Sequence, residues 1–221
     1  MKFYTYKLSE TDKPELAIGD IENDTILYPL TQFDMQFTDM NDLIARIRCD
    51  RHAIQAIEAE LEMLKTALMK EELRDKLRHI SRADTIPCAA IPHPKQDVIC
   101  LGINYMAHAE EGARYHNEAF GGERPFPIYF SKRCSEAVGP DGFIESHPGL
   151  VERLDYEAEL AVIIGDTLHN ATAAEARRAI IGYTLMCDYS ERSYQLEHGG
   201  QWTKGKSYDT FAPFGPVLVS K

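Results

Sequence analysis

The segment from Asp155 to Gly165 constrains the fold most, because it is the clearest β-strand of the chain, over residues 155–164. Side chains alternate between the two faces of a strand, so Asp155, Glu157 and Glu159 share one face. On a wholly exposed face they would form a row of solvated charges. If the face is partly buried, the repulsion between like charges is relieved by protonation or by a bound cation.

The chemistry of these side chains predicts which cation would bind. Carboxylate oxygens are hard ligands that suit Mg²⁺, Mn²⁺ or Ca²⁺ better than zinc or copper. Thr172 and Glu175 form a capping box that opens a helix expected to end near Gly182, and a strand over Tyr183–Cys187 follows. Asp188 comes directly after that strand and is placed to complete a site of three carboxylates.

The spacing of apolar residues changes within the first 84 residues. Residues 1–37 alternate apolar and polar positions in short runs, which predicts a small β-meander. Residues 41–80 contain no proline or glycine, and an apolar seam ending at Leu68 predicts a long amphipathic helix. The seam is compatible with a short coiled coil. Because it covers at most about three heptads, we favour a helix packed on its own domain.

Three prolines in residues 85–97 mark a linker between an N-terminal domain, residues 1–84, and a second domain, residues 98–221. After the linker we expect a strand over residues 98–101 and one or two helical turns over residues 104–114. Extended structure is expected again over residues 125–130.

The formal net charge is −11, which disfavours binding to nucleic acids and to anionic membranes. The N-terminus lacks the apolar core of a signal peptide, and no apolar run is long enough to cross a bilayer, so we expect a cytoplasmic protein. Five widely spaced cysteines without a CxxC pair predict neither a disulfide framework nor a zinc site.

Two further motifs leave open alternatives. His108 and Glu111 lie three residues apart; such a pair acts as a general base when the acid orients the imidazole ring, but taken alone it is more often a surface pair. Residues 200–207 match the phosphate-binding pattern G-x-x-x-x-G-K-[ST], which requires a buried strand before it and a helix after it. Their neighbours are polar before and rich in proline after, so we do not expect an NTPase. Lys206 is nevertheless a cation close to an acidic cluster.

Five collinear motifs together resemble the fumarylacetoacetate hydrolase family from about Val98 onward. They are Tyr105-Met106-Ala107-His108 with Glu111, Val138-Gly139-Pro140, Asp155-Tyr156-Glu157-Ala158-Glu159-Leu160, Asp188-Tyr189-Ser190-Glu191-Arg192, and Gly205-Lys206-Ser207-Tyr208-Asp209-Thr210-Phe211-Ala212-Pro213. The resemblance implies a mostly β, α+β protein with a mixed β-roll, a small N-terminal α/β domain and a homodimeric assembly. It also implies a divalent cation, Mg²⁺ or else Mn²⁺ or Ca²⁺, held by Glu157, Glu159 and Asp188. His108 and Glu111 match the family's catalytic dyad, and Lys206 matches its active-site lysine.

The sequence departs from the family pattern at two places. Glu191 stands where a small residue is commoner, which we expect to be a harmless surface change. The chain also ends at Lys221, where the family normally continues through further strands, so we expect a roll that lacks its C-terminal strands.

The resemblance implies a metal-dependent hydrolase of C–C bonds in small β-diketo or 2-oxo acids, of the acylpyruvate or fumarylacetoacetate type. The same residues would serve an isomerase, decarboxylase or lyase acting on 2-oxo diacids, because all of these reactions share an enolate-like intermediate. A truncated, inactive family member that still binds metal or a partner chain is the remaining alternative.

Overall fold

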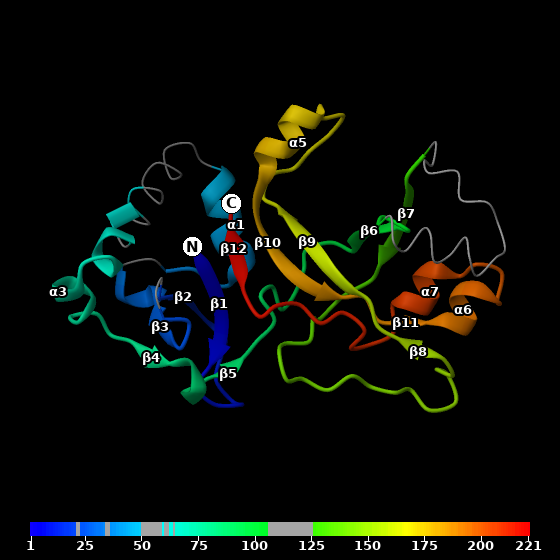
Figure 1. Ribbon diagram of the computed structural model, residues 1–221, viewed down its shortest axis with the longest axis horizontal. Helices are drawn as coiled ribbons and strands as arrows, with labels where there is room; N and C mark the ends of the chain where they lie inside the picture. The colour runs from blue at the N-terminus through cyan, green and yellow to red at the C-terminus, as the bar shows by residue number, and fades with distance from the viewer. Residues whose placement is uncertain (21–22, 34–35, 50–58, 60–61, 64, 106–125) are drawn as a thin grey trace.

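The computed structural model describes residues 1–221 except for 21–22, 34–35, 50–58, 60–61, 64 and 106–125. Its largest unit is an eight-stranded sheet, in which seven strands follow the order β4-β3-β2-β1-β12-β10-β9 and β5 pairs with β1 (Figure 1). Those strands are β1 (Lys2–Lys7), β2 (Glu15–Gly19), β3 (Ile26–Pro29), β4 (Ile80–Ser81), β5 (Ile86–Pro87), β9 (Ala158–Ile164), β10 (Ile180–Cys187) and β12 (Leu218–Ser220).

The first three strands confirm the predicted meander, since β1, β2 and β3 pair as antiparallel neighbours. Strand β12 pairs with β1, with Phe3 opposite Leu218, and so brings the two ends of the chain together (Figure 1). The sheet therefore includes strands from both sides of the predicted linker and one strand, β5, from within it.

Helix α1 (Met40–Cys49) covers the N-terminal part of the sheet. Met40 and Leu43 are buried against Phe3, Ile18 and other sheet residues in the largest apolar core. Helix α1 therefore presents an apolar side to the sheet.

The single helix predicted over residues 41–80 is wrong in its extent. Leu68 is buried in the main core, but the chain turns at Met69, and Lys70 is extended, with φ −106° and ψ 111°. A short helix, α3 (Glu71–Arg74), follows without any buried residue, and β4 then begins at Ile80. The apolar seam ends at Leu68, so the next turn has no apolar face whose burial would stabilise a continuing helix. The seam residues before Leu68 lie outside the described residues.

Helix α5 (Ala173–Ala179) begins with the predicted capping box, in which Thr172 and Glu175 exchange hydrogen bonds. The helix ends three residues earlier than expected, because β10 already begins at Ile180. Ile180 and Ile181 are β-branched and favour the strand. The short 3₁₀ helices η1 (Leu30–Phe33) and η2 (Arg82–Asp84) complete the N-terminal part.

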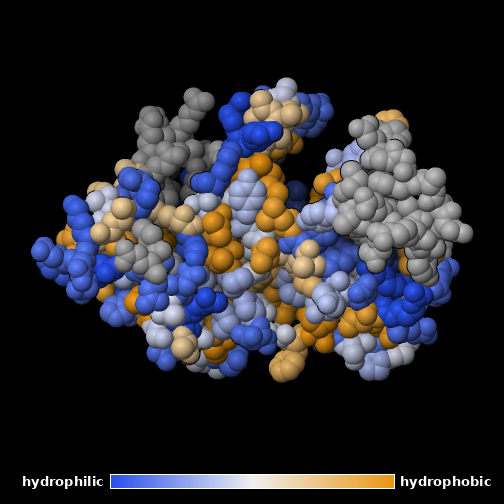
Figure 2. Space-filling view, in the orientation of Figure 1, coloured by the Kyte–Doolittle hydropathy of each residue, from blue (hydrophilic) through white to orange (hydrophobic). Residues whose placement is uncertain are grey.

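The strand predicted over residues 155–164 is divided in two. Strand β8 (Leu154–Asp155) pairs with β11 (Ser190–Glu191) in a separate two-stranded sheet, and β9 starts only at Ala158. The expected alternation persists along β9, where Glu159, Ala161 and Ile163 are half-buried. The opposite face is apolar yet exposed, and it continues onto β10 and β12 through Leu160, Val162, Leu185 and Val219 (Figure 2).

Strands β6 (Val98–Gly102) and β7 (Ile128–Lys132) form another two-stranded sheet beside helices α6 (Arg192–Leu196) and α7 (Trp202–Lys206) (Figure 1). The protein is thus mostly β with few helices, as predicted, and its sheets do not close into a complete roll within the described residues. Among those residues no helix combines the length and apolar character that a membrane span needs.

Candidate functional site

The end of β10 brings two predicted carboxylates side by side. Asp188 follows β10 directly, and its backbone N–H donates to the carbonyl of Glu157 at 2.8 Å. In the β9–β10 ladder, Glu159 stands opposite Met186, two residues before Asp188. The predicted ligands therefore lie near one another, where β9 begins and β10 ends.

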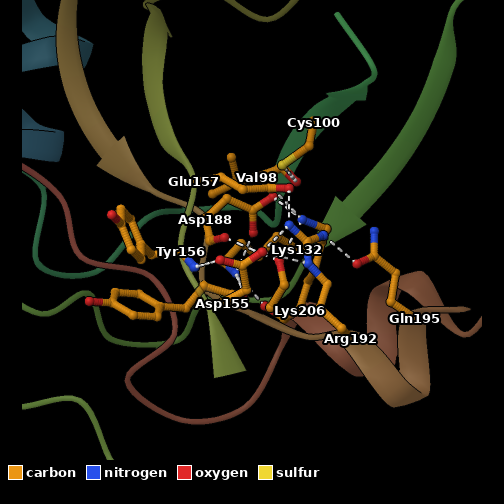
Figure 3. Close-up of polar contacts among 12 residues, drawn as sticks. Val98, Cys100, Lys132, Asp155, Tyr156, Glu157, Asp188, Arg192, Gln195 and Lys206 are labelled. Atoms are coloured by element: carbon orange, nitrogen blue, oxygen red, sulfur yellow. Dashed lines mark hydrogen bonds and ion pairs between the residues drawn. The ribbon is translucent and has the colours of Figure 1, made fainter. Parts of the chain in front are cut away.

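Lys206 lies between two of these carboxylates. Its ammonium donates to Glu157 Oε2 at 2.6 Å, to Asp188 Oδ2 at 2.7 Å and to the hydroxyl of Ser190 at 2.8 Å (Figure 3). The Lys206 side chain is 2% exposed and also lies 5.1 Å from the centre of the Phe130 ring. The structure therefore brings Lys206, Glu157 and Asp188 into one buried ion-pair network.

Two cations that sequence reasoning missed complete the network. Arg192 donates to Glu157 Oε1 at 2.7 Å and to Asp155 Oδ2 at 2.8 Å, so Asp155 is held by Arg192. Lys132, at the end of β7, donates to Asp188 Oδ1 at 2.6 Å (Figure 3). Every carboxylate oxygen of Glu157 and Asp188 thus accepts a hydrogen bond from a positively charged group.

The pKa values of Glu157 and Glu159 are shifted in opposite directions. Burial by itself would raise the pKa of Glu157, but the Lys206 ammonium and the Arg192 guanidinium more than offset it and lower that pKa to about 2. The pKa of Glu159 is raised, first by burial and then by the nearby charges of Glu157 and Asp188, against hydrogen bonds from Tyr105 and Asn104. Glu159 forms no ion pair with any residue that the structure describes, so a cation would relieve the repulsion on it.

The donor chemistry of the three carboxylates fits a hard divalent cation. Glu157 and Asp188 share one neighbouring cation, Lys206, and their charges are among the causes that raise the pKa of Glu159 after burial. Within the described ranges, however, no three His, Cys, Asp or Glu side chains form a ready metal-binding cluster, and the Lys206 ammonium contacts both Glu157 and Asp188. His108 and Glu111 lie outside the described residues.

The G-x-x-x-x-G-K-[ST] segment is built differently from a phosphate-binding loop. Residues of this segment form α7 itself, which follows α6 and a turn, and the next regular element after it is the strand β12. Gly205 permits the close approach of α7, because a Cβ there would lie 2.8 Å from the carbonyl oxygen of Glu191. The lysine of the motif consequently points into the carboxylate network.

The expectation that Glu191 is a harmless surface residue is wrong. Glu191 is completely buried and is the N-cap of α6, where its carboxylate accepts hydrogen bonds from the backbone N–H groups of Ser193 and Tyr194. It also accepts from the N–H groups of Glu152 and Arg153 beside β8. Burial would raise the pKa of Glu191, but these four hydrogen bonds lower it. Glutamate is not among the residues that ordinarily cap helices, so the sequence gives no clear signal for this cap.

We expect Glu191→Ala to lower the free energy of unfolding by about 2 kcal/mol or more, because one buried and three partly buried N–H donors lose their acceptor. Urea unfolding of the variant measures the loss. Glu175→Ala, which removes a capping carboxylate on the exposed helix α5, is the matched control and should cost clearly less. Equal losses in the two variants would show that burial of Glu191 adds nothing to an ordinary cap.

Four cysteines are free thiols: Cys88, Cys100, Cys134 and Cys187. Burial raises the pKa of Cys100 to about 12 and that of Cys134 to about 11, so these two thiols are poor nucleophiles.

Comparisons with known proteins match this arrangement to a family. The family model described as "Fumarylacetoacetate (FAA) hydrolase C-terminal" matches residues 97–221. An oxaloacetate tautomerase of Xenopus laevis, named as mitochondrial, is 36% identical over 225 residues, which are 100% of this chain and 62% of that protein.

Two solved structures are also similar to this chain. A fumarylacetoacetate hydrolase from psychrophilic Exiguobacterium antarcticum is 28% identical, with a TM-score of 0.70, over 100% of this chain and 66% of that one. A 5-carboxymethyl-2-hydroxymuconate delta-isomerase from Mycobacterium smegmatis shares the fold, at 22% identity and a TM-score of 0.63, over 100% of this chain and 67% of that one. The chain therefore spans 62% to 67% of the length of these three proteins.

Proposed function

Because the chain belongs to the fumarylacetoacetate hydrolase family, we propose that its site binds a small 2-oxo or β-diketo acid together with a divalent cation and hydrolyses a C–C bond of that acid. The acid would be of the acylpyruvate or fumarylacetoacetate type. The observation that supports this most directly is the meeting of Glu157, Asp188 and Lys206 near a third carboxylate, Glu159, whose pKa is raised by burial and by the charges of the other two.

In this proposal Glu157, Glu159 and Asp188 hold the cation, with Mg²⁺ preferred and Mn²⁺ or Ca²⁺ as substitutes. A bound divalent cation acts as a Lewis acid that polarises the 2-oxo carbonyl group. The protein's part is to keep the carboxylates ionised and fixed in place, which Lys206 and Arg192 do for Glu157 by lowering its pKa.

The remaining roles fall to residues that move protons or balance charge. His108, oriented by Glu111, would accept a proton from the attacking water. Lys206 would stabilise negative charge that develops on the substrate, because its ammonium lies in a site with little access to water. The charge of Lys206 acts in that direction even while its three hydrogens are bonded to protein oxygens.

Isomerisation or tautomerisation of a 2-oxo diacid is the second candidate function. The observation that favours it is the 36% identity to a protein named as an oxaloacetate tautomerase. Decarboxylase and lyase reactions need the same enolate stabilisation. A variant lacking His108 separates the candidates, since only the hydrolase needs that residue to activate water.

Calorimetric titration tests the proposal, and the expected result is that Mn²⁺ binds alone whereas pyruvate or oxalate binds only in its presence. The control is the same titration of the 2-oxo acid with EDTA in place of the metal. Equal binding of the acid with and without Mn²⁺ would contradict the proposed role of the cation. Binding of Mn²⁺ without turnover of any acylpyruvate or 2-oxo diacid would identify an inactive family member.

We further propose that the protein acts as a cytoplasmic homodimer without a nucleic-acid or membrane partner. The net charge of −11 supports the absence of such anionic partners. Sedimentation velocity measures the assembly state directly, and a monomer at micromolar concentration would remove the dimer from the proposal.

A further inference from the structure

Lys132 is a buried cation with a full set of protein acceptors. Its residue is 0% exposed, and an ammonium group has three hydrogens to donate. The three acceptors are Asp188 Oδ1 at 2.6 Å, the carbonyl of Tyr189 at 2.8 Å and the carbonyl of Lys206 at 2.5 Å. With no hydrogen left to donate and no exposed surface, Lys132 has no direct contact to offer a substrate.

These three bonds join elements that are far apart in the sequence. Lys132 ends β7, Asp188 follows β10, and Lys206 ends α7 (Figure 3). Lys132 therefore holds one carboxylate oxygen of Asp188, while Lys206 contacts the other oxygen. The same ammonium also fixes the backbone of the helix that carries Lys206.

We propose that Lys132 is a positioning residue of the cation site, acting on the ligand Asp188 rather than on the cation or the substrate. The inference rests on the proposed function, because it takes Asp188 as a ligand. Residues that hydrogen-bond to a metal ligand orient it, and replacing them typically weakens metal binding about 10- to 100-fold. Lys132 has the geometry of such a residue.

Electrostatics alone predicts the opposite effect, which makes the inference testable. Lys132 carries a positive charge, so a purely electrostatic neighbour would repel a divalent cation, and removing that charge would tighten binding. A positioning residue fixes the carboxylate, so removing it lets Asp188 rotate and weakens binding. A residue with only a packing role would change stability without changing metal affinity.

The experiment measures the affinity for Mn²⁺ by calorimetry in Lys132→Met and Lys132→Gln. We expect Lys132→Met to weaken Mn²⁺ binding by about 10- to 100-fold. Lys132→Gln keeps two donor hydrogens and should lie between the Met variant and the unsubstituted protein. Lys204→Met removes an exposed ammonium from the same helix as Lys206 and should leave the affinity unchanged.

Each other result has a distinct meaning. Unchanged or tighter Mn²⁺ binding in a folded Lys132 variant would overturn the inference and leave the proposed function intact. Failure of both variants to fold, seen by circular dichroism, would also overturn it, because Lys132 would then support the whole fold. Absence of Mn²⁺ binding in the unsubstituted protein would overturn the proposed function first, and the inference with it.

Discussion

Glu159→Ala is expected to abolish divalent-cation binding while leaving the fold intact. Glu159 is half-buried on β9, and the nearby charges of Glu157 and Asp188 contribute to its raised pKa. Removing its carboxylate takes away a ligand and also relieves that repulsion, so the free energy of unfolding should stay the same or increase. The affinity for Mn²⁺ should fall by more than the roughly 100-fold that loss of an outer partner of a ligand can cause.

The control for this variant is Glu136→Ala, which removes an exposed carboxylate elsewhere on the chain. It should change neither Mn²⁺ binding nor stability. Unchanged Mn²⁺ affinity in Glu159→Ala would remove Glu159 from the ligand set. A large loss of stability in that variant would show instead that Glu159 holds the fold, through its hydrogen bonds from Tyr105 and Asn104.

The acidic strand and Asp188 could be predicted because both depend on local rules. The two-residue period places Glu157 and Glu159 on one face, and consecutive strands commonly pair, which brings Asp188 beside Glu157. The antiparallel register of β9 and β10 confirms that pairing. Local rules did not reveal that β8 separates from β9, because that separation depends on the pairing of β8 with β11.

Lys206 could be predicted as a cation near the acidic cluster, but the other two cations of the site could not. Lys132 lies 56 residues from Asp188, and Arg192 lies 35 residues from Glu157, so only the folded chain brings them together. A single lysine at the end of a strand is ordinarily exposed, and nothing around Lys132 in the sequence indicates complete burial. The roles of His108 and Glu111 stay predictions, since both residues lie outside the described part of the chain.

The predicted helix boundaries are wrong where tertiary packing determines the end of the helix. Residues 41–80 lack a helix-breaking residue, yet the helix ends after Leu68, where the apolar seam stops. Composition alone does not show this end, because Glu71 and Glu72 are good helix formers. Burial of a face, rather than propensity, supplies most of the stability of a helix in a protein.

Lys206→Met is expected to lower the free energy of unfolding by about 3–5 kcal/mol at pH 7, the range for removing one partner of a buried ion pair. The substitution leaves Glu157 and Asp188 without the ammonium that bridges them at 2.6 and 2.7 Å. Lys204→Met, on the exposed side of the same helix, removes a cation that lies 3.9 Å from the Tyr194 ring and should cost about 1 kcal/mol or less.

The loss should depend on pH in a direction set by Glu157. In the folded protein the pKa of Glu157 is lowered to about 2, against an ordinary value of 4.5, so its stabilising contribution is present above pH 4.5 and is lost as the pH falls toward 2. Without Lys206 the pKa of Glu157 rises, and the variant has less of this contribution to lose. The difference in stability between the two proteins should therefore be largest near pH 7 and shrink between pH 4.5 and 2. Urea unfolding followed by the fluorescence of the only tryptophan, Trp202, measures this difference. A difference that stays constant from pH 7 to pH 3 would mean that Lys206 stabilises the fold by packing rather than by its charge.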